Sequence, residues 1–184
     1  MGQRAPTTLA LLFWSAFTGA AGFPLSCAYV AQAADAELVS HPACAALDGE
    51  RLILAPTHFR QMRFETDGLA SVWVAGRWYD VQPSGAALPV VTLDNGPDPF
   101  TEGLVRSQRQ GRILYVDVHF REIIGPRYDW GWPFVRRRAL VCRGCRLIQE
   151  GEHSRLSGGR WGWIDRQGRE VVPVQLTEAQ ARSR

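Results

Sequence analysis

The chain has 184 residues, enough for one domain with a buried core but short for two. Hydrophobic residues make up 46% of it and charged residues 21%, which excludes a disordered chain, and 18 glycines with 11 prolines lack the period of a collagen fibre. All 21 basic residues are arginine, but 18 acidic residues reduce the net charge to +3, so the charge gives no reason to expect nucleic acid as a partner.

The N-terminal segment has the layout of a signal peptide. Arg4 precedes an apolar stretch at residues 9–17, and small residues follow. Ala31 and Ala33 are small residues at the two positions that a signal peptidase recognises, so we predict cleavage between Ala33 and Ala34. The sequence therefore predicts an exported protein, periplasmic or secreted.

Two alternatives use the same residues. An uncleaved apolar segment from Leu9 to Leu25 would anchor the chain in a membrane, although polar residues, glycines and a proline interrupt it. A lipoprotein would be cut before Cys27, although Pro24 stands where a lipid-modification motif usually has leucine. A membrane is expected as a partner only in these two cases.

Internal repeats are the next feature along the chain. Short similar stretches are anchored at Gly68, Gly103 and Ala139, which lie 35 and 36 residues apart. Two further sets of residues recur at matching offsets, with an insertion of 12 residues required between Val141 and Trp161: Trp78, Ile113 and Trp161, then Gln82, Asp117 and Asp165. The polar residues 150–157 are predicted to form this insertion as an extended loop.

Each repeat has the pattern of a three-stranded β-meander. Short runs of β-branched and aromatic residues alternate with glycine-containing turns, as in the hairpin predicted around Gly76. The fold class predicted is all-β, with about three degenerate meanders of about 35 residues stacked or wrapped after an N-terminal signal helix. One further helix is expected over residues 177–182, with Thr177 as its cap.

The repeats resemble the WG-repeat family. The stretch 159–173, which contains Trp161, Gly162, Asp165 and Gly168, looks like a full copy of the WG repeat, and residues 99–105 look like the opening of another. The resemblance covers roughly residues 48–173 and is degenerate in the first two copies. It implies a β-rich module that serves as a binding or scaffolding surface and carries no catalytic residues. The predicted organisation is a signal peptide at 1–33, an N-terminal segment at 34–47, the repeat domain at 48–173 and a tail at 174–184.

The cysteines allow several kinds of chemistry. A disulfide between Cys142 and Cys145 is favoured because two intervening residues keep the thiols close. The alternatives are a bridge from Cys44 to one of this pair, a zinc site that adds Cys44 and His153, and a thioredoxin-like redox motif. Cleavage after Ala33 would leave an odd number of cysteines.

No other pattern predicts a catalytic site, a cofactor or a metal. The four histidines lack metalloprotease spacing, and the stretch 94–98 is interpreted as a turn between repeats rather than as a calcium loop. A cluster of tryptophans and arginines remains as a candidate binding surface: Trp130, Trp132, Trp163, Arg136 and Arg138. We therefore expect a non-catalytic binding module with a protein or cell-envelope polymer as its partner. The alternative is a carbohydrate or envelope-polymer binder that uses exposed tryptophan and arginine.

Overall fold

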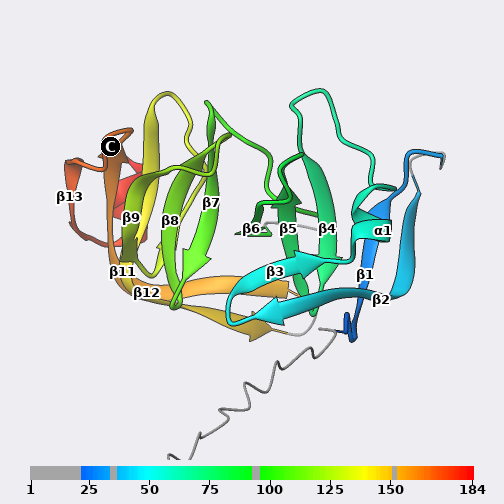
Figure 1. Ribbon diagram of the computed structural model, residues 1–184. Coiled ribbons are helices and arrows are strands. Elements are labelled where there is room, and N and C mark those ends of the chain that lie inside the picture. The colour runs from blue at the N-terminus through cyan, green and yellow to red at the C-terminus, as the bar shows by residue number, and fades with distance from the viewer. Residues whose placement is uncertain (1–21, 34–36, 93–95, 151–152) are drawn as a thin grey trace, which may run out of the picture.

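The computed structural model of the chain describes residues 22–33, 37–92, 96–150 and 153–184 (Figure 1). Three antiparallel sheets hold nearly all of the regular structure in this part of the chain, so the predicted all-β class is confirmed. The apolar stretch 9–17 of the predicted signal helix lies outside the described residues. None of the described helices is long and apolar enough to cross a membrane.

The first sheet combines the N-terminal segment with the first repeat. Its spatial order is β3-β2-β1-β4-β5-β6, and the short helix α1 (Pro56–Phe59) follows β3. The strands are β1 (Leu25–Val30), β2 (Leu38–Asp48), β3 (Arg51–Leu54), β4 (Ala70–Val74), β5 (Arg77–Val81) and β6 (Ala87–Val90). One face of the sheet buries a core that includes Tyr29, Met62 and Val72.

The other two sheets contain the second and third repeats. One has the order β7-β8-β9 and the other β10-β11-β12-β13, and both pack around a shared core that includes Tyr115, Phe134 and Ile164. Their strands are β7 (Leu104–Arg109), β8 (Arg112–Asp117), β9 (Glu122–Tyr128), β10 (Trp130–Gly131), β11 (Arg138–Glu150), β12 (His153–Asp165) and β13 (Glu170–Leu176).

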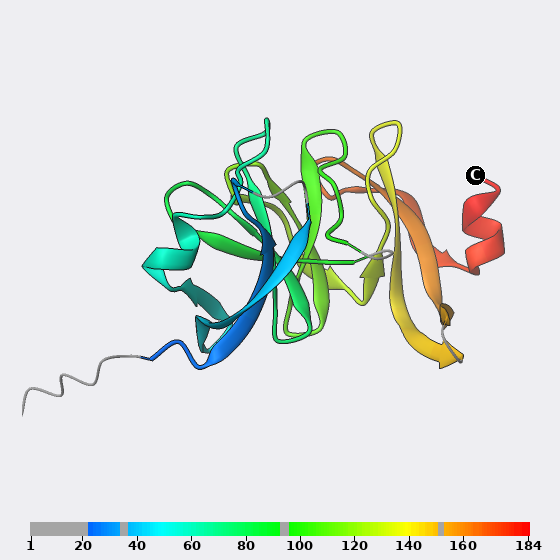
Figure 2. The same ribbon diagram turned by 90° about the vertical axis from the view of Figure 1, so that its right-hand side faces the viewer.

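A C-terminal helix closes the chain. Helix α2 (Glu178–Arg182) begins at Thr177, whose hydroxyl accepts a hydrogen bond from the Gln180 backbone while the Gln180 side chain accepts one from the Thr177 backbone. The predicted helix and its cap are therefore confirmed. Figures 1 and 2 place α2 at the opposite end of the molecule from α1, and the fully buried Ala181 shows that the tail packs against the domain.

The three meanders are β4–β5–β6, β7–β8–β9 and β11–β12–β13, as predicted. The same turn links the second and third strands of each. The backbone N–H groups of Gln82, Asp117 and Asp165 each donate to the carbonyl four residues later, at 2.8, 3.0 and 2.9 Å. Four residues before these turns, the predicted equivalent positions Trp78, Ile113 and Trp161 are 9%, 1% and 1% exposed, so they are also equivalent in their burial.

The third repeat differs from the predicted alignment. Leu104 pairs with Asp117 in the second repeat, and Arg138 pairs with Asp165 in the third. The third-repeat residue equivalent to Gly103 is therefore Arg137, whose φ is +63°, and not Ala139. The predicted anchor was two residues late. A shift of two residues keeps every side chain on the same face of a strand, so the hydrophobic pattern could not reveal it.

The insertion in the third repeat is a β-ribbon rather than the predicted loop. Leu104 and Asp117 are 13 residues apart, whereas Arg138 and Asp165 are 27 apart. The additional residues continue the ladder between β11 and β12 as far as Glu150 paired with His153. Figure 1 shows this long hairpin running from the end of the molecule that carries α2 along one edge toward the first sheet. Both faces of the outer part of this ribbon are accessible to water, so its residues are mostly polar. A polar composition is also typical of a loop, which is why the sequence predicted one.

Both disulfides involve strands. Cys142 and Cys145 are bonded within β11, which confirms the predicted local bridge. Cys44 is bonded to Cys27 on the neighbouring strand β1, and this pairing was not predicted. The sulfur of Cys27 is therefore not free to carry a lipid. Two disulfides that use all four cysteines of the sequence indicate an oxidising, exported environment.

Candidate functional site

A groove of about 410 Å³ lies where the first repeat meets the long hairpin of the third. The β4–β5 hairpin and the end of β6 form one side, and strands β7, β8, β10 and β11 contribute the remaining lining residues. The side chains that determine its chemistry are Trp73, Arg77, Gln108, Trp130 and Leu147. Of these, only Trp130 belongs to the predicted binding surface.

Trp73 is the most exposed aromatic feature of the groove. It lies on β4 between Val72 and Val74, which are fully buried, whereas 38% of Trp73 is exposed. Its ring meets that of Trp78, its partner in the register of β4 and β5, edge to face at 5.5 Å between centroids. Trp78 belongs to a buried cluster with Val90 and Leu114, so the exposed indole of Trp73 packs against a side chain that is itself held in the core.

A buried ion pair supports Trp130 on the other side of the groove. The Arg106 guanidinium lies over the Trp130 ring at 5.0 Å from its centroid. Arg106 also donates to the Asp98 carboxylate at 2.5 Å and to the Gly131 carbonyl at 2.8 Å, and the side chains of the ion pair are 1% and 2% exposed. The indole N–H of Trp130 is buried and has no hydrogen-bond partner among the described residues, so Trp130 offers ring surface rather than a donor.

The long hairpin reaches the groove through Leu147, which is 56% exposed. Gly144 on β11 and Gly159 on β12 lie at the base of the outer part of the hairpin, and both have a positive φ of +77°. A Cβ atom on Gly159 would stand 2.5 Å from the Cys142 sulfur and 2.5 Å from the Cys145 backbone nitrogen, so no larger residue fits without displacing the disulfide. The Cys142–Cys145 bridge and this glycine pair together set the path by which the hairpin leaves the sheet.

The described lining of the groove has little charge. Arg77 is the one charged residue among the described residues that line it, and its side chain is exposed. Gln108 and Thr92 are the other polar side chains of this described lining, and the rest of it is apolar or glycine. Such a surface suits a ligand that has an apolar face together with neutral or negatively charged polar groups.

The structure brings the three tryptophans of the predicted surface into one cluster. Trp130 and Trp132 meet edge to face at 6.0 Å, and Trp163 packs in the same partly buried cluster with Leu140 and Trp161. The Trp163 indole N–H donates to the Ala181 carbonyl at 2.7 Å, and Arg182 lies over Trp132. These tryptophans therefore hold α2 against the domain, and all three are partly exposed.

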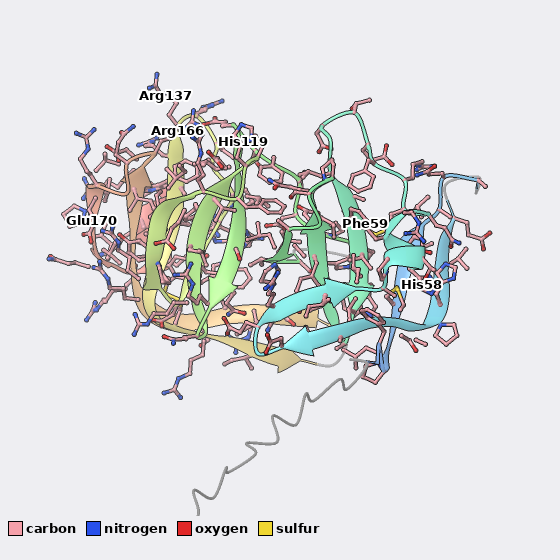
Figure 3. All side chains as sticks on the ribbon, in the orientation of Figure 1. His58, Phe59, His119, Arg137, Arg166 and Glu170 are labelled. Atoms are coloured by element: carbon pink, nitrogen blue, oxygen red, sulfur yellow. A yellow bond between two sulfur atoms is a disulfide. The ribbon has the colours of Figure 1, made fainter. Side chains whose placement is uncertain are left out.

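The predicted arginines have different surroundings. Arg138 lies over the Trp163 ring at 5.1 Å from its centroid. Arg136 is exposed in the turn before β11, where its φ of +52° is unusual for a residue other than glycine. Figure 3 shows Arg137, from the same turn, beside Arg166 at the edge of the molecule opposite the long hairpin. The structure therefore places Arg138 with the tryptophans and leaves Arg136 apart from the groove.

Comparison with known proteins gives one family match. Residues 161–181 match the family model of the WG containing repeat. The chain therefore carries a WG repeat. No curated protein and no solved structure matches the chain significantly. The matched residues span the latter part of β12, the turn at Asp165, all of β13 and most of α2.

The Trp-Gly pair of the WG repeat has a packing explanation. Trp161 fills the cluster beneath α2, and its indole N–H donates to the Gly158 carbonyl at 3.0 Å. A Cβ atom on Gly162 would stand 2.4 Å from the Val172 carbonyl oxygen, because β13 passes directly over this position. Glycine is thus required for the close approach of two strands.

The acidic residue of the WG repeat stabilises a turn. The Asp165 carboxylate accepts hydrogen bonds from the backbone N–H groups of Gln167 and Arg169 and from the Arg169 side chain. Asp117 makes the same three bonds with His119 and Arg121 in the second repeat. The turn ends at Gly168, whose φ is +75°. Gly68 and Gly103 likewise have positive φ, at +80° and +78°, in the turns that precede β4 and β7.

The predicted alternatives for the cysteines are resolved by the disulfides. Cys142 and Cys145 are bonded to each other on a strand rather than at a helix N-terminus, so the setting that activates a redox thiol is absent there. The zinc alternative required thiolates that the two disulfides occupy, and the side chain of His153 lies outside the described part. Among the described residues, no three histidine, cysteine or acidic side chains are grouped to hold a metal ion.

Two histidines contact Tyr29 near α1. The His41 ring stacks on Tyr29 at 4.5 Å, and the Tyr29 hydroxyl lies 3.1 Å from Nδ1 of His58, which Figure 3 shows at α1. The hydroxyl also donates to the Gln61 side chain at 3.1 Å. These contacts hold α1 and the turn after it against β1.

Asp80 is a buried acid at the contact between the first and second repeats. It is 4% exposed and accepts one hydrogen bond, from the Ser71 hydroxyl at 3.0 Å. Burial raises its pKa to about 6, and the neighbouring charges of Asp67 and Asp98 act in the same direction. Its ionised form is therefore less favourable in the folded protein than in the unfolded chain.

Replacing Asp80 with asparagine is expected to stabilise the protein above pH 6. Because the folded pKa is raised, the stability that Asp80 contributes is complete below about pH 4 and is lost as the pH rises through about 6. Asp80→Asn keeps an acceptor for Ser71 and removes this loss, so its gain over wild type should be about 2 kcal/mol at pH 7.5 and near zero at pH 3.5. Urea unfolding at both values measures the difference.

Asp117→Asn is the matched control, because its pKa is shifted in the opposite direction. Slight burial acts to raise the pKa of Asp117, but hydrogen bonds from Arg121 and His119 and the Arg121 charge lower it overall. The stability that ionised Asp117 contributes to the fold is therefore present at neutral pH and lost on acidification. Asp117→Asn should destabilise the protein at pH 7.5. Equal effects of the two variants at both pH values would contradict this account.

Proposed function

We propose that this protein is an exported, non-catalytic binding module and that its ligand site is the groove between the first repeat and the long hairpin. The exposed ring of Trp73 supports the proposal most strongly, because a large aromatic residue held open beside a concave surface favours binding. The meanders supply the rigid frame, and the long hairpin supplies a side of the groove that the shorter repeats lack.

The groove lining supports binding over catalysis. Among the described residues that line it there is no histidine, cysteine or acidic residue to serve as a general base or metal ligand. The acid with a strongly raised pKa, Asp80, is not among the lining residues. Turnover of a bound ligand that is lost on replacing any groove residue would contradict this part of the proposal.

The partner we propose is a segment of a protein or of a cell-envelope polymer with an apolar face. Trp73 and Leu147 would contact that face from opposite sides of the groove. Arg77 would pair with a negatively charged or neutral acceptor group.

One observation favours the carbohydrate alternative in particular. The groove combines a partly exposed indole with the Gln108 amide and the Arg77 guanidinium, and these are the groups that stack on a sugar ring and bond to its hydroxyl or carboxylate groups. We therefore include carbohydrate binding as the second candidate function.

Trp73→Ala is expected to weaken ligand binding at least tenfold. Removing the ring deletes the most exposed aromatic surface of the groove, and anchors of this type dominate binding energy. The probes are insoluble peptidoglycan, a soluble acidic polysaccharide and a phage-displayed library of extended peptides. Sedimentation measures the first, titration calorimetry the second, and enrichment followed by calorimetry the third.

Ile123→Ala is the matched control for this experiment. Ile123 is 43% exposed on β9 and does not line the groove, so its removal should leave binding unchanged. Selective loss in the Trp73 variant with a polysaccharide supports the carbohydrate candidate, and selective loss with a peptide supports a protein partner. Equal binding by both variants would exclude the groove as the ligand site.

A further inference from the structure

Strand β1 is an interior strand of the largest sheet. It pairs with β2 on one side and with β4 on the other, which places it between the N-terminal hairpin and the first repeat (Figure 1). Cys27 and Tyr29 point into the core at 2% and 0% exposure. Without β1, the β2–β3 hairpin would lose its connection to β4 in the sheet, and the core would lose Tyr29, one of its two buried tyrosines.

The cysteine pairing also depends on β1. The Cα atoms of Cys27 and Cys44 lie 5.6 Å apart, and their disulfide ties β1 to β2. Together with the Cys142–Cys145 bridge, it leaves no free cysteine in the chain. Cleavage between Ala33 and Ala34 would discard Cys27 and leave Cys44 as an unpaired thiol in an oxidising compartment, where such a thiol is a liability.

The following segment is also part of the fold. Ala31 forms a bridge with Met62, and the Gln32 backbone N–H donates to the Gln61 carbonyl at 2.9 Å. The Gln32 side chain donates to the carbonyls of Arg60 and Met62 at 3.1 Å each. Residues 25–32 therefore behave as structural residues of the folded domain rather than as a spacer that precedes it.

The sequence offers a second cleavage position that spares β1. The apolar stretch 9–17 is followed, after Thr18, by small residues at 19–22, Gly-Ala-Ala-Gly, which satisfy the small-residue requirement of a signal peptidase. Cleavage after Ala20, Ala21 or Gly22 would leave β1 in the mature protein, whereas cleavage after Ala33 would remove it.

We propose that the chain is processed within this small-residue cluster, after Ala20, Ala21 or Gly22, and that the mature protein keeps β1 and both disulfides. Signal peptidase hydrolyses one peptide bond with one water molecule, so the released protein has a new amino terminus at residue 21, 22 or 23. The proposal shares only the export of the chain with the proposed function, and its test does not involve a ligand.

The test is the mass and N-terminal sequence of the full chain after export into a bacterial periplasm. We expect an amino terminus at residue 21, 22 or 23 and no reaction with a thiol-alkylating reagent until the protein is reduced, after which four cysteines react. A terminus at Ala34, a retained Met1 in the exported protein, or a lipid on Cys27 would each overturn the proposal.

Two variants separate the two cleavage positions. Ala33→Leu changes an exposed residue, so the fold should tolerate it, and it removes the small residue that the later position requires. We expect its amino terminus and yield to match those of wild type. The triple variant Ala20→Gln, Ala21→Gln, Gly22→Gln should instead lose the mature form. A mature terminus that shifts in the Ala33→Leu protein and persists in the triple variant would contradict the proposal.

Discussion

Replacing Asp98 with alanine is expected to lower the free energy of unfolding by about 3–5 kcal/mol, because it leaves the Arg106 guanidinium buried without its counter-ion. The Arg106 side chain is 1% exposed and cannot reach water without unpacking its surroundings. Its remaining bond to the Gly131 carbonyl satisfies only part of the guanidinium. Urea unfolding monitored by circular dichroism measures the loss.

Two control variants test whether the expected loss of stability arises from the burial of this ion pair. Glu178→Ala removes the exposed partner of Arg182 on α2 and should cost less than about 1 kcal/mol. The double variant Asp98→Ala, Arg106→Met removes both charges and should recover a large part of the loss, since an apolar side chain can fill the site. An Asp98→Ala protein as stable as the Glu178→Ala protein would contradict the prediction.

The same ion pair connects stability to the groove. Arg106 lies on the Trp130 ring, so a displaced guanidinium would release one side of the groove while Trp73 stays in place on Trp78. Asp98→Ala is therefore expected to weaken ligand binding in addition to lowering stability. Asp98 stands in a stretch interpreted from sequence as a turn, and only the structure shows that its carboxylate faces an arginine from β7.

The repeated core positions and turns of the fold could be predicted from the sequence because they recur at a fixed spacing. The spacing of Trp78, Ile113 and Trp161 located equivalent positions, and the polar residues four positions later located equivalent turns. The length of the β11–β12 hairpin was not accessible, because polar residues occur equally in loops and in ribbons exposed on both faces. The third anchor was misplaced because a shift of two residues leaves the alternation unchanged.

The groove was missed for a different reason. It is built from separate repeats, so no local motif contains its residues. A signal for Trp73 was nevertheless present, since valines on both sides in a strand place the intervening tryptophan on the opposite face from the core. Arg77, Gln108 and Leu147 have no comparable signal, because their convergence depends on how the hairpins are arranged in space.

Strand β1 lies within the segment that the sequence suggested would be removed. Ala31 and Ala33 have the small side chains that a peptidase requires, but Ala31 forms a bridge with Met62 directly after β1. The Cys27–Cys44 pair carried the opposing signal, since an even set of cysteines in an exported chain favours keeping all four.

Replacing Trp161 with alanine is expected to destabilise the protein by about 3–5 kcal/mol, the cost typical of removing a fully buried tryptophan. The side chain fills the cluster formed with Leu140, Cys142 and Ala181, so its loss opens a cavity beneath α2 and removes the bond to the Gly158 carbonyl. Thermal unfolding and the near-ultraviolet circular dichroism of the aromatic cluster measure the effect.

The stabilities of Trp161 and Trp73 variants separate the structural from the binding tryptophans. Trp73→Ala removes a ring that is 38% exposed and should cost less than half as much as Trp161→Ala while abolishing most ligand binding. Ile113→Ala, at the equivalent position of the second repeat, should resemble Trp161→Ala and cost about 2–5 kcal/mol. If Trp73 and Trp161 proved equally important for stability, the repeat position would not define the core, and Trp73 would be a packing residue rather than the exposed anchor of a binding groove.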